Sequence, residues 1–486
     1  MAVRSARALL VGPVAAALIA AGLSTPAAAA AAPSRLDPGL STSGHALTKV
    51  IVSGAPGANG LVREAVREAG GTDIASLAII NGWSARVPAD ELSDLAGATG
   101  VTAVTADRDI QLAGNTYDAS ISSSPYAWNS QAVPVWSSAG TKGGGVSVAV
   151  LDTGVTAIQD LSGRVMAGPD LSGENNNAVD SMGHGTVMAG IIAGDGTAAG
   201  SQPRTGVAPE AQIISVKVAG ANGATDVSTM LAGMAWIGAF KDVYNIKVLN
   251  LSWGVPSTQD PTIDPINFAV ETLWHLGVTV VVAAGNAGTV LKPGDDPLVV
   301  TVGAYDDKGD TVAANDSIPA WSAQGPTAKG LAKPDLVASG RTLIAPRAPG
   351  SVVENLNPNA LVAPAYIRAS GTSEATAVTS GVAALLLAEH PLWTPDQVKY
   401  ALKSTASKLS GVSSTLQGSG RVQASAAMNA GVLFAPIQIA VATGLGSLDA
   451  SRGASAPVYY VCGGQVVELS GDNTSWCSPW QSGAWT

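Results

Sequence analysis

Short runs of Val and Ile alternate with stretches of helical spacing from about residue 145 onwards. Five of these runs show little alternation between apolar and polar positions, which is typical of parallel strands buried on both faces. Helical stretches at 226–243 and 265–277 lie between some of them. The pattern therefore predicts a doubly wound α/β domain with a mostly parallel sheet. The five predicted strands are 145–152, 211–218, 246–252, 277–286 and 297–304.

A second pattern precedes this domain, over about residues 47–112. It predicts a strand, a helix, two short strands, a second helix that ends at a Gly, and a last strand. The order βαββαβ indicates a small ferredoxin-like α+β module. These changes of pattern divide the chain into four regions. They are a leader at 1–32, the small module at 33–112, the α/β domain at 113–434 and a Gly/Ser/Trp-rich tail at 435–486.

The last part of the α/β domain carries a strong helix start. Thr394 is a good N-cap, and Pro395 takes the first helical position. Gln397, three residues after the cap, completes a capping box. We therefore expect a helix that begins at Pro395.

The leader has the three parts of a secretory signal peptide. Arg4 and Arg7 give a positive end, residues 9–23 an apolar core, and residues 27–32 small-residue cleavage options. A membrane anchor is the alternative, but this apolar core is short for a bilayer span. We therefore expect the leader to be removed and the mature protein to be secreted, extracellular and free of the membrane.

Composition and charge exclude a nucleic-acid partner, and both cysteines of the chain lie in the tail. The chain has 486 residues, of which 46% are apolar and 13% charged, as expected of a folded protein with a large core. Its net charge is −10 and no cluster of Lys or Arg occurs, so we expect no nucleic-acid partner. The two cysteines, Cys462 and Cys477, lie in the tail, and export to an oxidising compartment favours a disulfide between them.

Four polar residues stand in turns beside predicted strand ends and helix starts. Asp152 ends one apolar strand and Asn286 follows another, while His184 stands between glycines before a small-residue helix. Ser373 follows Gly-Thr at the start of a long apolar stretch. Each of these residues alone fits a turn or a helix cap. Together they supply a nucleophile, a base, a carboxylate that orients the base, and an amide donor for an oxyanion.

Six segments of the α/β domain resemble those of the subtilisin-like serine peptidases, the S8 family. They are AVLDTGV, GHGT, NLSWG, AAGN, KPDLVASG and SGTSEA, in the Asp–His–Ser chain order of that family. The resemblance covers the whole domain and implies that Asp152, His184 and Ser373 form the catalytic triad. It also implies that Asn286 is the oxyanion donor. The expected activity is that of a secreted serine endopeptidase that hydrolyses peptide bonds through an acyl-enzyme.

The same resemblance gives expectations for processing, cofactors and partners. It implies that the 47–112 module is an inhibitor-type propeptide, which assists folding, blocks the cleft and is cut away by the enzyme itself. We expect a monomer that acts on protein or peptide substrates and needs no cofactor for catalysis. A structural calcium ion is common in the family, but the sequence has no Asp-rich loop of the EF-hand kind, so calcium binding stays open.

The resemblance also locates the pocket for the substrate side chain that precedes the scissile bond, P1. Its walls carry no charge, and Ala287 stands where many relatives have a Glu after the oxyanion Asn. We therefore expect large apolar P1 side chains, in preference to Arg or Lys. The wall residues are Ser252, Trp253 and Gly254 on one side and Ala283, Ala284 and Gly285 on the other.

One departure from the family stands beside the nucleophile. The residue after Ser373 is usually apolar, and here it is Glu374. A carboxylate in the first turn suits the helix dipole, but a buried one needs a partner or a proton. Two alternatives to the peptidase are compatible with parts of this pattern. One is a catalytically silent binding protein on the same fold. The other is an esterase of the α/β-hydrolase type, which the order of His184 before Ser373 disfavours.

Overall fold

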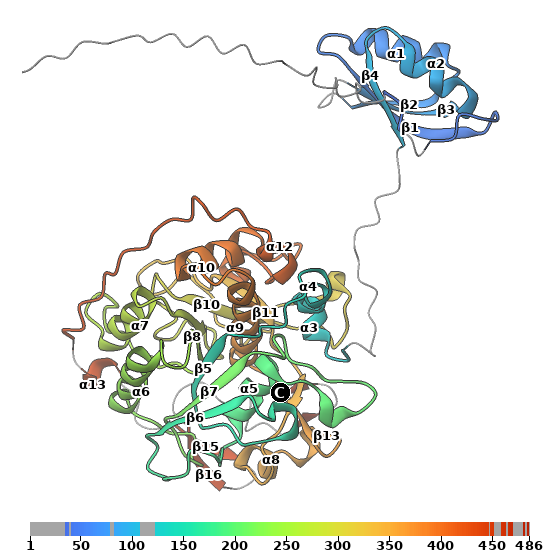
Figure 1. The fold of residues 1–486 in the computed structure, drawn as a ribbon. Coiled ribbons are helices and arrows are strands. Elements are labelled where there is room, and N and C mark those ends of the chain that lie inside the picture. Colours follow the sequence, from blue (N-terminus) through green and yellow to red (C-terminus); the bar gives the residue numbers. More distant parts are fainter. Residues whose placement is uncertain are drawn as a thin grey trace, which may run out of the picture. The chain divides into compact units, whose positions relative to one another are not determined.

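The computed structural model describes residues 35–37, 40–77, 82–106, 122–446 and 448–451, together with four short strands between 458 and 485. The chain divides into two compact units at residue 114 (Figure 1). The predicted signal peptide lies outside the described residues. In the part of the chain that is described, no helix is both long and apolar enough to cross a membrane.

The first unit is a four-stranded antiparallel sheet with two helices. Its strands follow the order β2-β3-β1-β4, and each neighbouring pair is antiparallel. Val62 and Val66 of α1 are fully buried together with Val50 and Val52 of β1, so the helix packs its apolar face against the sheet. The element order is the predicted βαββαβ. The elements are β1 (Leu47–Gly54), α1 (Asn59–Glu68), β2 (Thr72–Leu77), β3 (Gly82–Pro88), α2 (Leu92–Gly97) and β4 (Val101–Ala106).

The second unit is built on a seven-stranded sheet in the order β11-β10-β9-β8-β5-β7-β6. Every neighbouring pair in it is parallel, as the uninterrupted apolar runs predict. β6 and β11 are additional to the predicted strands, because β6 is a partly exposed edge strand and β11 is short. The strands are β5 (Ser147–Asp152), β6 (Val165–Asp170), β7 (Gln212–Lys217), β8 (Ile246–Leu251), β9 (Thr279–Ala283), β10 (Val300–Tyr305) and β11 (Leu336–Ser339).

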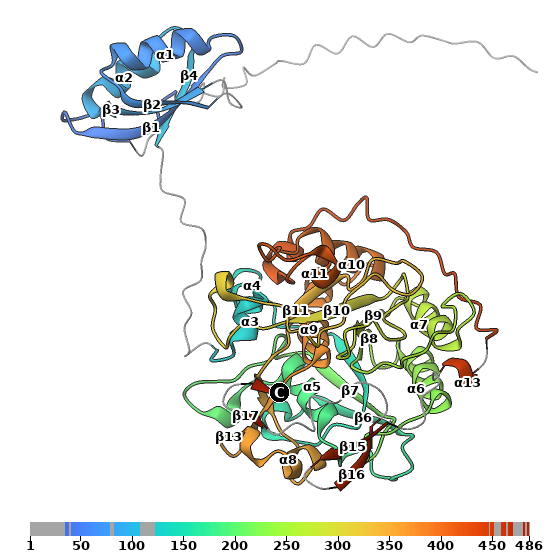
Figure 2. The same cartoon turned by 180° about the vertical axis from the view of Figure 1, so that it is seen from behind.

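Helices cover this sheet in two groups. α9 lies against β8, β9, β10 and β11 and packs on α5, whereas α6 and α7 pack on each other and on β5 and β9. Figures 1 and 2 both show α6 and α7 side by side at one flank of the unit, with α10 above the sheet. Residues 372–387 are all buried, and all of them except Glu374 are apolar or small, as a helix enclosed by protein requires. The long helices are α5 (His184–Ala193), α6 (Val227–Phe240), α7 (Pro265–His275), α9 (Thr372–Glu389) and α10 (Pro395–Ser404).

Shorter elements complete the second unit. A small antiparallel sheet in the order β12-β14-β13 stands next to α5. Its strands are β12 (Leu343–Pro346), β13 (Leu361–Val362) and β14 (Tyr366–Ala369). The short helices are α3 (Pro125–Asn129), α4 (Ala132–Ser138), α8 (Val352–Leu356), α11 (Ser414–Gln417), α12 (Ala424–Met428) and α13 (Leu448–Ser451). Two terminal hairpins follow, β15 (Val458–Cys462) with β16 (Gln465–Leu469), and β17 (Trp480–Gln481) with β18 (Ala484–Trp485).

The predicted capping box starts α10 as expected. The Thr394 hydroxyl accepts a hydrogen bond from the backbone N–H of Gln397, and the Gln397 side chain accepts one from the backbone N–H of Thr394. These two bonds satisfy donors that the first turn of a helix cannot pair internally. They fix the start of the helix that brings Lys399 and Lys403 to the amino-terminal edge of the sheet.

The two lysines of α10 meet a buried aspartate where β10 and β11 begin. Asp335 lies 2.7 Å from the Nζ atoms of both Lys333 and Lys403, and 3.7 Å from Lys399 Nζ. It also accepts a 2.9 Å hydrogen bond from the backbone N–H of Thr301. Burial alone would raise the pKa of Asp335, but the three lysines hold it well below its usual range. The cluster thus ties α10 to the amino-terminal edge of the sheet.

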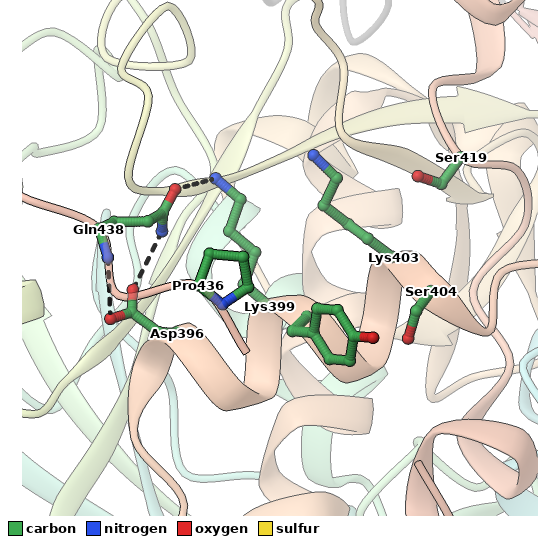
Figure 3. Close-up of a pocket in the computed structure, with 8 residues that line it drawn as sticks. Asp396, Lys399, Lys403, Ser404, Ser419, Pro436 and Gln438 are labelled. Atoms are coloured by element: carbon green, nitrogen blue, oxygen red, sulfur yellow. Dashed lines mark hydrogen bonds between the residues drawn. The ribbon is translucent and has the colours of Figure 1, made fainter. Parts of the chain in front are cut away.

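The segment 435–446, which the sequence analysis assigns to the tail, is bonded to the α/β unit. Gln438 donates to Asp396 through its backbone N–H and through its side-chain amide, at 3.2 and 3.1 Å. Its side-chain oxygen accepts a 3.2 Å bond from Lys399 Nζ, as Figure 3 shows. Pro436 and Gln438 of this segment line a pocket together with residues of α10.

A buried carboxylate of α7 holds the same segment a few residues further on. Glu271 Oε2 accepts hydrogen bonds of 2.8 Å from the backbone N–H groups of both Val441 and Ala442. The backbone N–H of Thr443 then donates to the carbonyl of Thr262 at 2.8 Å. Because Glu271 is 1% exposed, these donors replace the water that a carboxyl group would otherwise bind.

Candidate active site

Asp152 and His184 meet at the carboxyl-terminal edge of the large sheet. Asp152 is the last residue of β5, and His184 is the first residue of α5. His184 Nδ1 lies 2.7 Å from Asp152 Oδ1, and both side chains are buried. The backbone N–H of Thr153 donates to the same Asp152 oxygen at 2.8 Å. The carboxylate is thereby fixed in the position that holds the Nδ1–H tautomer of the imidazole.

A second aspartate, Asp180, fixes the turn from which His184 projects. It accepts hydrogen bonds of 2.7 Å from Gly183 N–H and Thr153 Oγ1, and of 2.8 Å from both the N–H and the hydroxyl of Thr186. Burial raises the pKa of Asp180 in spite of these donors. The residue thus joins the turn after β5 to the first turn of α5.

Gly185 allows the two elements to approach this closely. A Cβ atom at this position would lie 2.1 Å from the carbonyl oxygen of Gly154 and 3.1 Å from Cβ of Asp152. Any side chain would therefore push α5 away from β5 and lengthen the Asp152–His184 hydrogen bond. Position 185 therefore has room only for glycine, because any Cβ atom would collide with the backbone after β5.

Acidic neighbours set the charge of the imidazole. Burial alone would lower the pKa of His184, but Asp152 opposes it through its charge and its hydrogen bond. The charges of Glu374 and Asp180 add to that effect and bring the pKa of His184 to about 9. Glu374 belongs to the first turn of α9, so a charge at the start of that helix acts on the ring.

Ser373 is the second residue of α9 and is fully buried. Gly371 is the N-cap and no side chain caps the helix, so Ser373 is not a capping residue. Its hydroxyl donates to the carbonyl oxygen of Ser252, just after β8, at 3.0 Å. The hydroxyl of Ser252 donates in return to the carbonyl of Ser373 at 3.1 Å and accepts a 2.9 Å bond from Asn250. This pairing fixes the start of α9 against the end of β8.

Asn286 follows β9 and faces the same helix start. Its Oδ1 accepts hydrogen bonds from the backbone N–H of Thr372 at 2.8 Å and from the Thr372 hydroxyl at 3.0 Å. Because the oxygen is committed to Thr372, the Nδ2 group is on the opposite side of the amide, against Gly371. The side chain therefore presents its donor group next to the residue that precedes Thr372 and Ser373.

Glu374, the departure noted in the sequence, lies on this same side. It is fully buried. Its Oε2 is 2.7 Å from the point where a side chain on Gly371 would begin, and Asn286 Nδ2 is 3.2 Å from that point. A carboxylate thus stands beside the amide donor and acts electrostatically on the histidine. The site has four acidic or amide groups around one imidazole and one serine.

Two further expectations, calcium binding and the disulfide, stay untested by the described residues. Among the described residues, no group of three or more His, Cys, Asp or Glu side chains is arranged to hold a metal ion, and calcium binding stays open. For the predicted disulfide, Cys477 and the side chain of Cys462 lie outside the described residues. The pairing therefore stays a prediction.

Comparison with known families decides the identity of this arrangement. The family model described as the subtilase family, Peptidase_S8, matches residues 143–420 and so covers the elements that carry Asp152, His184, Asn286 and Ser373.

The chain belongs to the subtilase family.

Its members are serine-type endopeptidases, which confirms the resemblance and the class of enzyme that the sequence predicts.

Two curated relatives show how far the similarity extends. Serine protease AprX of Bacillus subtilis (strain 168) is 36% identical over 291 residues, which are 58% of this chain and 66% of AprX, just under two thirds of its length. Subtilisin Savinase of Lederbergia lenta is 34% identical over 305 residues, which are 62% of this chain and 98% of Savinase. The similarity to Savinase thus covers nearly the whole of that enzyme.

A solved structure supports the fold. Fervidolysin from Fervidobacterium pennivorans, described as a keratinolytic enzyme related to subtilisin, has a TM-score of 0.53 at 22% identity. The match covers 81% of this chain and 63% of fervidolysin. At this identity it shows the fold alone, which is the doubly wound α/β fold predicted from the sequence.

In this subtilase, one supporting residue was missed by the sequence analysis. Asp180 contacts both the turn after Asp152 and the first turn of the His184 helix. Its signal was available, because an acidic residue just before a helix accepts hydrogen bonds from the unpaired N–H groups of the first turn. The segment GHGT indicates the role of His184 only, because Asp180 lies just before it.

Proposed function

We propose that this subtilase is a secreted endopeptidase that hydrolyses peptide bonds through an acyl-enzyme, with Asp152, His184 and Ser373 as its triad. The observation that carries the proposal is the 2.7 Å hydrogen bond between Asp152 and His184. It stands at the sheet edge to which Ser373 is also fixed, through its bond to Ser252. A serine hydroxyl is activated when a base held in one tautomer takes its proton, and both groups belong to this edge of the sheet.

The acylation step follows from these positions. Ser373 Oγ attacks the substrate carbonyl carbon while His184 Nε2 takes the hydroxyl proton. Asp152 keeps the Nδ1 proton on its own side of the ring and stabilises the imidazolium that forms. His184 then donates the proton to the leaving amine, and a water molecule repeats the cycle on the acyl-enzyme. The imidazole must be neutral at the start, so the rate increases as His184 loses its proton.

Developing negative charge on the carbonyl oxygen needs donors that are already in place. Asn286 Nδ2 is one, because its amide is oriented by Thr372. The backbone N–H of Ser373 is the second, in the first turn of α9, where the helix dipole favours negative charge. Both donors belong to buried, hydrogen-bonded elements and need little reorganisation during the reaction.

The rest of the chain fits the life cycle of a secreted precursor. The leader directs export, and the βαββαβ unit acts as an intramolecular inhibitor until the enzyme cuts it away. The mature enzyme acts as a monomer on protein or peptide substrates. These assignments are supported by the signal-like leader and by the division of the chain into two compact units.

Covalent labelling tests the proposal directly. The secreted protein is treated with a fluorophosphonate, digested and analysed by mass spectrometry, and the label is expected on Ser373. Ser373→Ala is expected to stay unlabelled and to accumulate as an uncut precursor in a protease-deficient host. Ser370→Ala removes another buried hydroxyl three residues earlier and serves as the matched control, which keeps the label. Normal maturation and casein hydrolysis by Ser373→Ala would show that Ser373 is not the nucleophile. A wild type that takes no label and hydrolyses no casein would favour the silent binding protein instead.

A further inference from the structure

The ends of β8 and β9 enclose the space beside the nucleophile. Ser252, after β8, exchanges two hydrogen bonds with Ser373. Gly285, after β9, donates its N–H to the Thr372 hydroxyl at 3.1 Å and precedes Asn286. An acyl group attached to Ser373, with its oxygen on Asn286, must place its side chain between these two strand ends. The inference that follows rests on the proposed peptidase function of this site.

A third chain segment runs between the two strand ends. The backbone N–H of Leu291 donates to the carbonyl of Ala284, in the β9 wall, at 2.9 Å. The next residue, Lys292, pairs with Val255, after the β8 wall, through two backbone bonds of 2.9 and 3.0 Å. The segment is therefore hydrogen-bonded to both walls and closes the gap between them.

The side chain of Leu291 fills the space that two wall glycines leave. A Cβ on Gly254 would lie 2.8 Å from Cβ of Leu291, and a Cβ on Gly285 would lie 2.7 Å from its Cγ. Leu291 is 5% exposed, so its isobutyl group is packed and not turned to solvent. The glycines widen the space between the walls, and the leucine occupies the room that they provide.

The backbone on both sides prevents Leu291 from moving aside. Lys292, its neighbour, is fixed at its end by a 2.8 Å contact between Nζ and Asp295, in a buried setting that also includes Asp264 at 3.9 Å. Moving Leu291 out of the space would break these contacts together with the backbone bonds to both walls. A large substrate side chain therefore meets a fixed floor.

We propose that Leu291 is the specificity-determining floor of the P1 pocket and restricts cleavage to peptides with a small P1 residue, Ala, Ser or Gly. This replaces the large apolar P1 residue expected from the uncharged walls. Wall composition indicates which charges a pocket excludes, but its depth is set by a residue from a different loop. The volume that Leu291 occupies limits the size of the P1 side chain, and this limit selects the substrate more strongly than the chemistry of the walls does.

The test compares peptides that differ only at P1. Fluorogenic peptides with Ala, Ser, Leu or Phe at P1 are assayed with the secreted enzyme produced from the full chain. The expected order of kcat/KM places Ala and Ser above Leu and Phe by at least about tenfold, since one methylene too many changes selectivity by roughly 10- to 200-fold.

Leu291→Ala should open the pocket. The ratio of kcat/KM for Phe to that for Ala is expected to rise by about 10- to 200-fold over the wild-type ratio. Leu298→Ala truncates another buried leucine in the same β9–β10 connection, and it controls for general loosening of the core. Its selectivity ratio should stay at the wild-type value.

The outcomes separate this inference from the proposed function. A labelled, active wild type that prefers Phe or Leu over Ala overturns the role of Leu291 and leaves the peptidase function standing. An unchanged ratio in Leu291→Ala does the same. A wild type that hydrolyses none of the peptides and takes no fluorophosphonate on Ser373 overturns both. If Leu291→Ala does not fold, the wild-type P1 profile alone decides the question.

Discussion

The two edges of the seven-stranded sheet handle buried charge in opposite ways. At the carboxyl-terminal edge, His184 is surrounded by the acidic groups Asp152, Asp180 and Glu374. At the amino-terminal edge, Asp335 is surrounded by three lysines. The first edge holds negative charge that an extra proton on the imidazole compensates. At the second edge, lysine side chains of the protein itself compensate the negative charge of Asp335.

This difference indicates which edge reacts and which edge stabilises. An imidazole among carboxylates gains stabilisation when it takes the proton of Ser373, as a catalytic base must. An aspartate among lysines gains nothing from changing its charge, and it joins β10, β11 and α10 instead. Ligands of parallel α/β sheets bind beyond the carboxyl ends of the strands, and here the charge distribution agrees with that rule.

The largest expected effect is on rate and comes from the reactive edge. Ser373→Ala should lower kcat by about six orders of magnitude, because triad members act as a unit. Its stability should change by only about 1 kcal/mol, the usual value of one hydrogen bond. Activity on an Ala-P1 peptide and urea unfolding of the same sample would separate the two quantities. A large loss of stability would mean that the hydroxyl is chiefly structural.

At the opposite edge, Asp335→Asn should have the reverse effect, with a large loss of stability and little loss of rate. Three lysines would lose their buried counter-charge, and the free energy of unfolding should fall by about 3–5 kcal/mol. Below the unfolding transition, kcat should stay near the wild-type value. Asp242→Asn, which removes the partner of Lys241 from an exposed ion pair, is the control and should not move the urea midpoint measurably.

The same aspartate makes stability depend on pH in a definite direction. The pKa of Asp335 is lower in the folded protein than in the unfolded chain, so its stabilisation is present at neutral pH. It is lost as the pH falls through the acid range towards the folded-state pKa. Asp335→Asn should therefore lose less stability on acidification than the wild type does.

The pH–rate profile should reveal the acidic surroundings of His184. With a pKa of about 9, the imidazole is mostly protonated at neutral pH, and kcat/KM should rise into the alkaline range. Glu374→Gln removes one of the charges that raise this pKa, so the acid limb should move to lower pH. Asp335→Asn, at the other edge, should leave the limb in place. Identical limbs in the wild type and in Glu374→Gln would show that Glu374 does not act on the ring.

The smallest effect concerns the helix that supplies two of the lysines. Thr394→Ala removes the side-chain half of the capping box and should cost about 1 kcal/mol of stability. The helix α10 carries Lys399 and Lys403. In the double variant, the stability lost by Thr394→Ala should therefore not add fully to the stability lost by Asp335→Asn. Strict additivity in urea unfolding would mean that the cap and the lysine cluster are independent.

The sequence predicted five of the seven strands of the sheet and the edge at which the site lies, for a clear physical reason. Uninterrupted Val and Ile runs specify buried parallel strands, and Gly-flanked polar residues mark their ends. Asp152 and His184 were therefore expected together, and the structure brings them within hydrogen-bond distance. The family followed from the same segments. Their catalytic roles remain a proposal that labelling will test.

Other parts of the site were only partly accessible from the pattern. The place of Asp180 before a helix indicates a cap, but only the fold shows that its carboxylate also contacts the turn after β5. Leu291 is an apolar residue in a loop, and its meaning depends on facing Gly254 and Gly285 from a third segment. Contacts between loops distant in sequence leave no periodic signal. The pocket depth proposed from Leu291 therefore differs from the expectation drawn from the wall residues, and the P1 profile decides between the two.

The contact of Glu271 with the extended segment defines where the polypeptide can be shortened. A protein truncated at residue 434, where the composition changes, would keep the buried Glu271 carboxylate but lose the N–H groups of Val441 and Ala442. Lys399 would lose Gln438 as well. Leaving a buried acceptor without its donors costs about 1–3 kcal/mol. The stop codon of a minimal enzyme therefore belongs beyond Gly446, some distance past the end of the family match at residue 420.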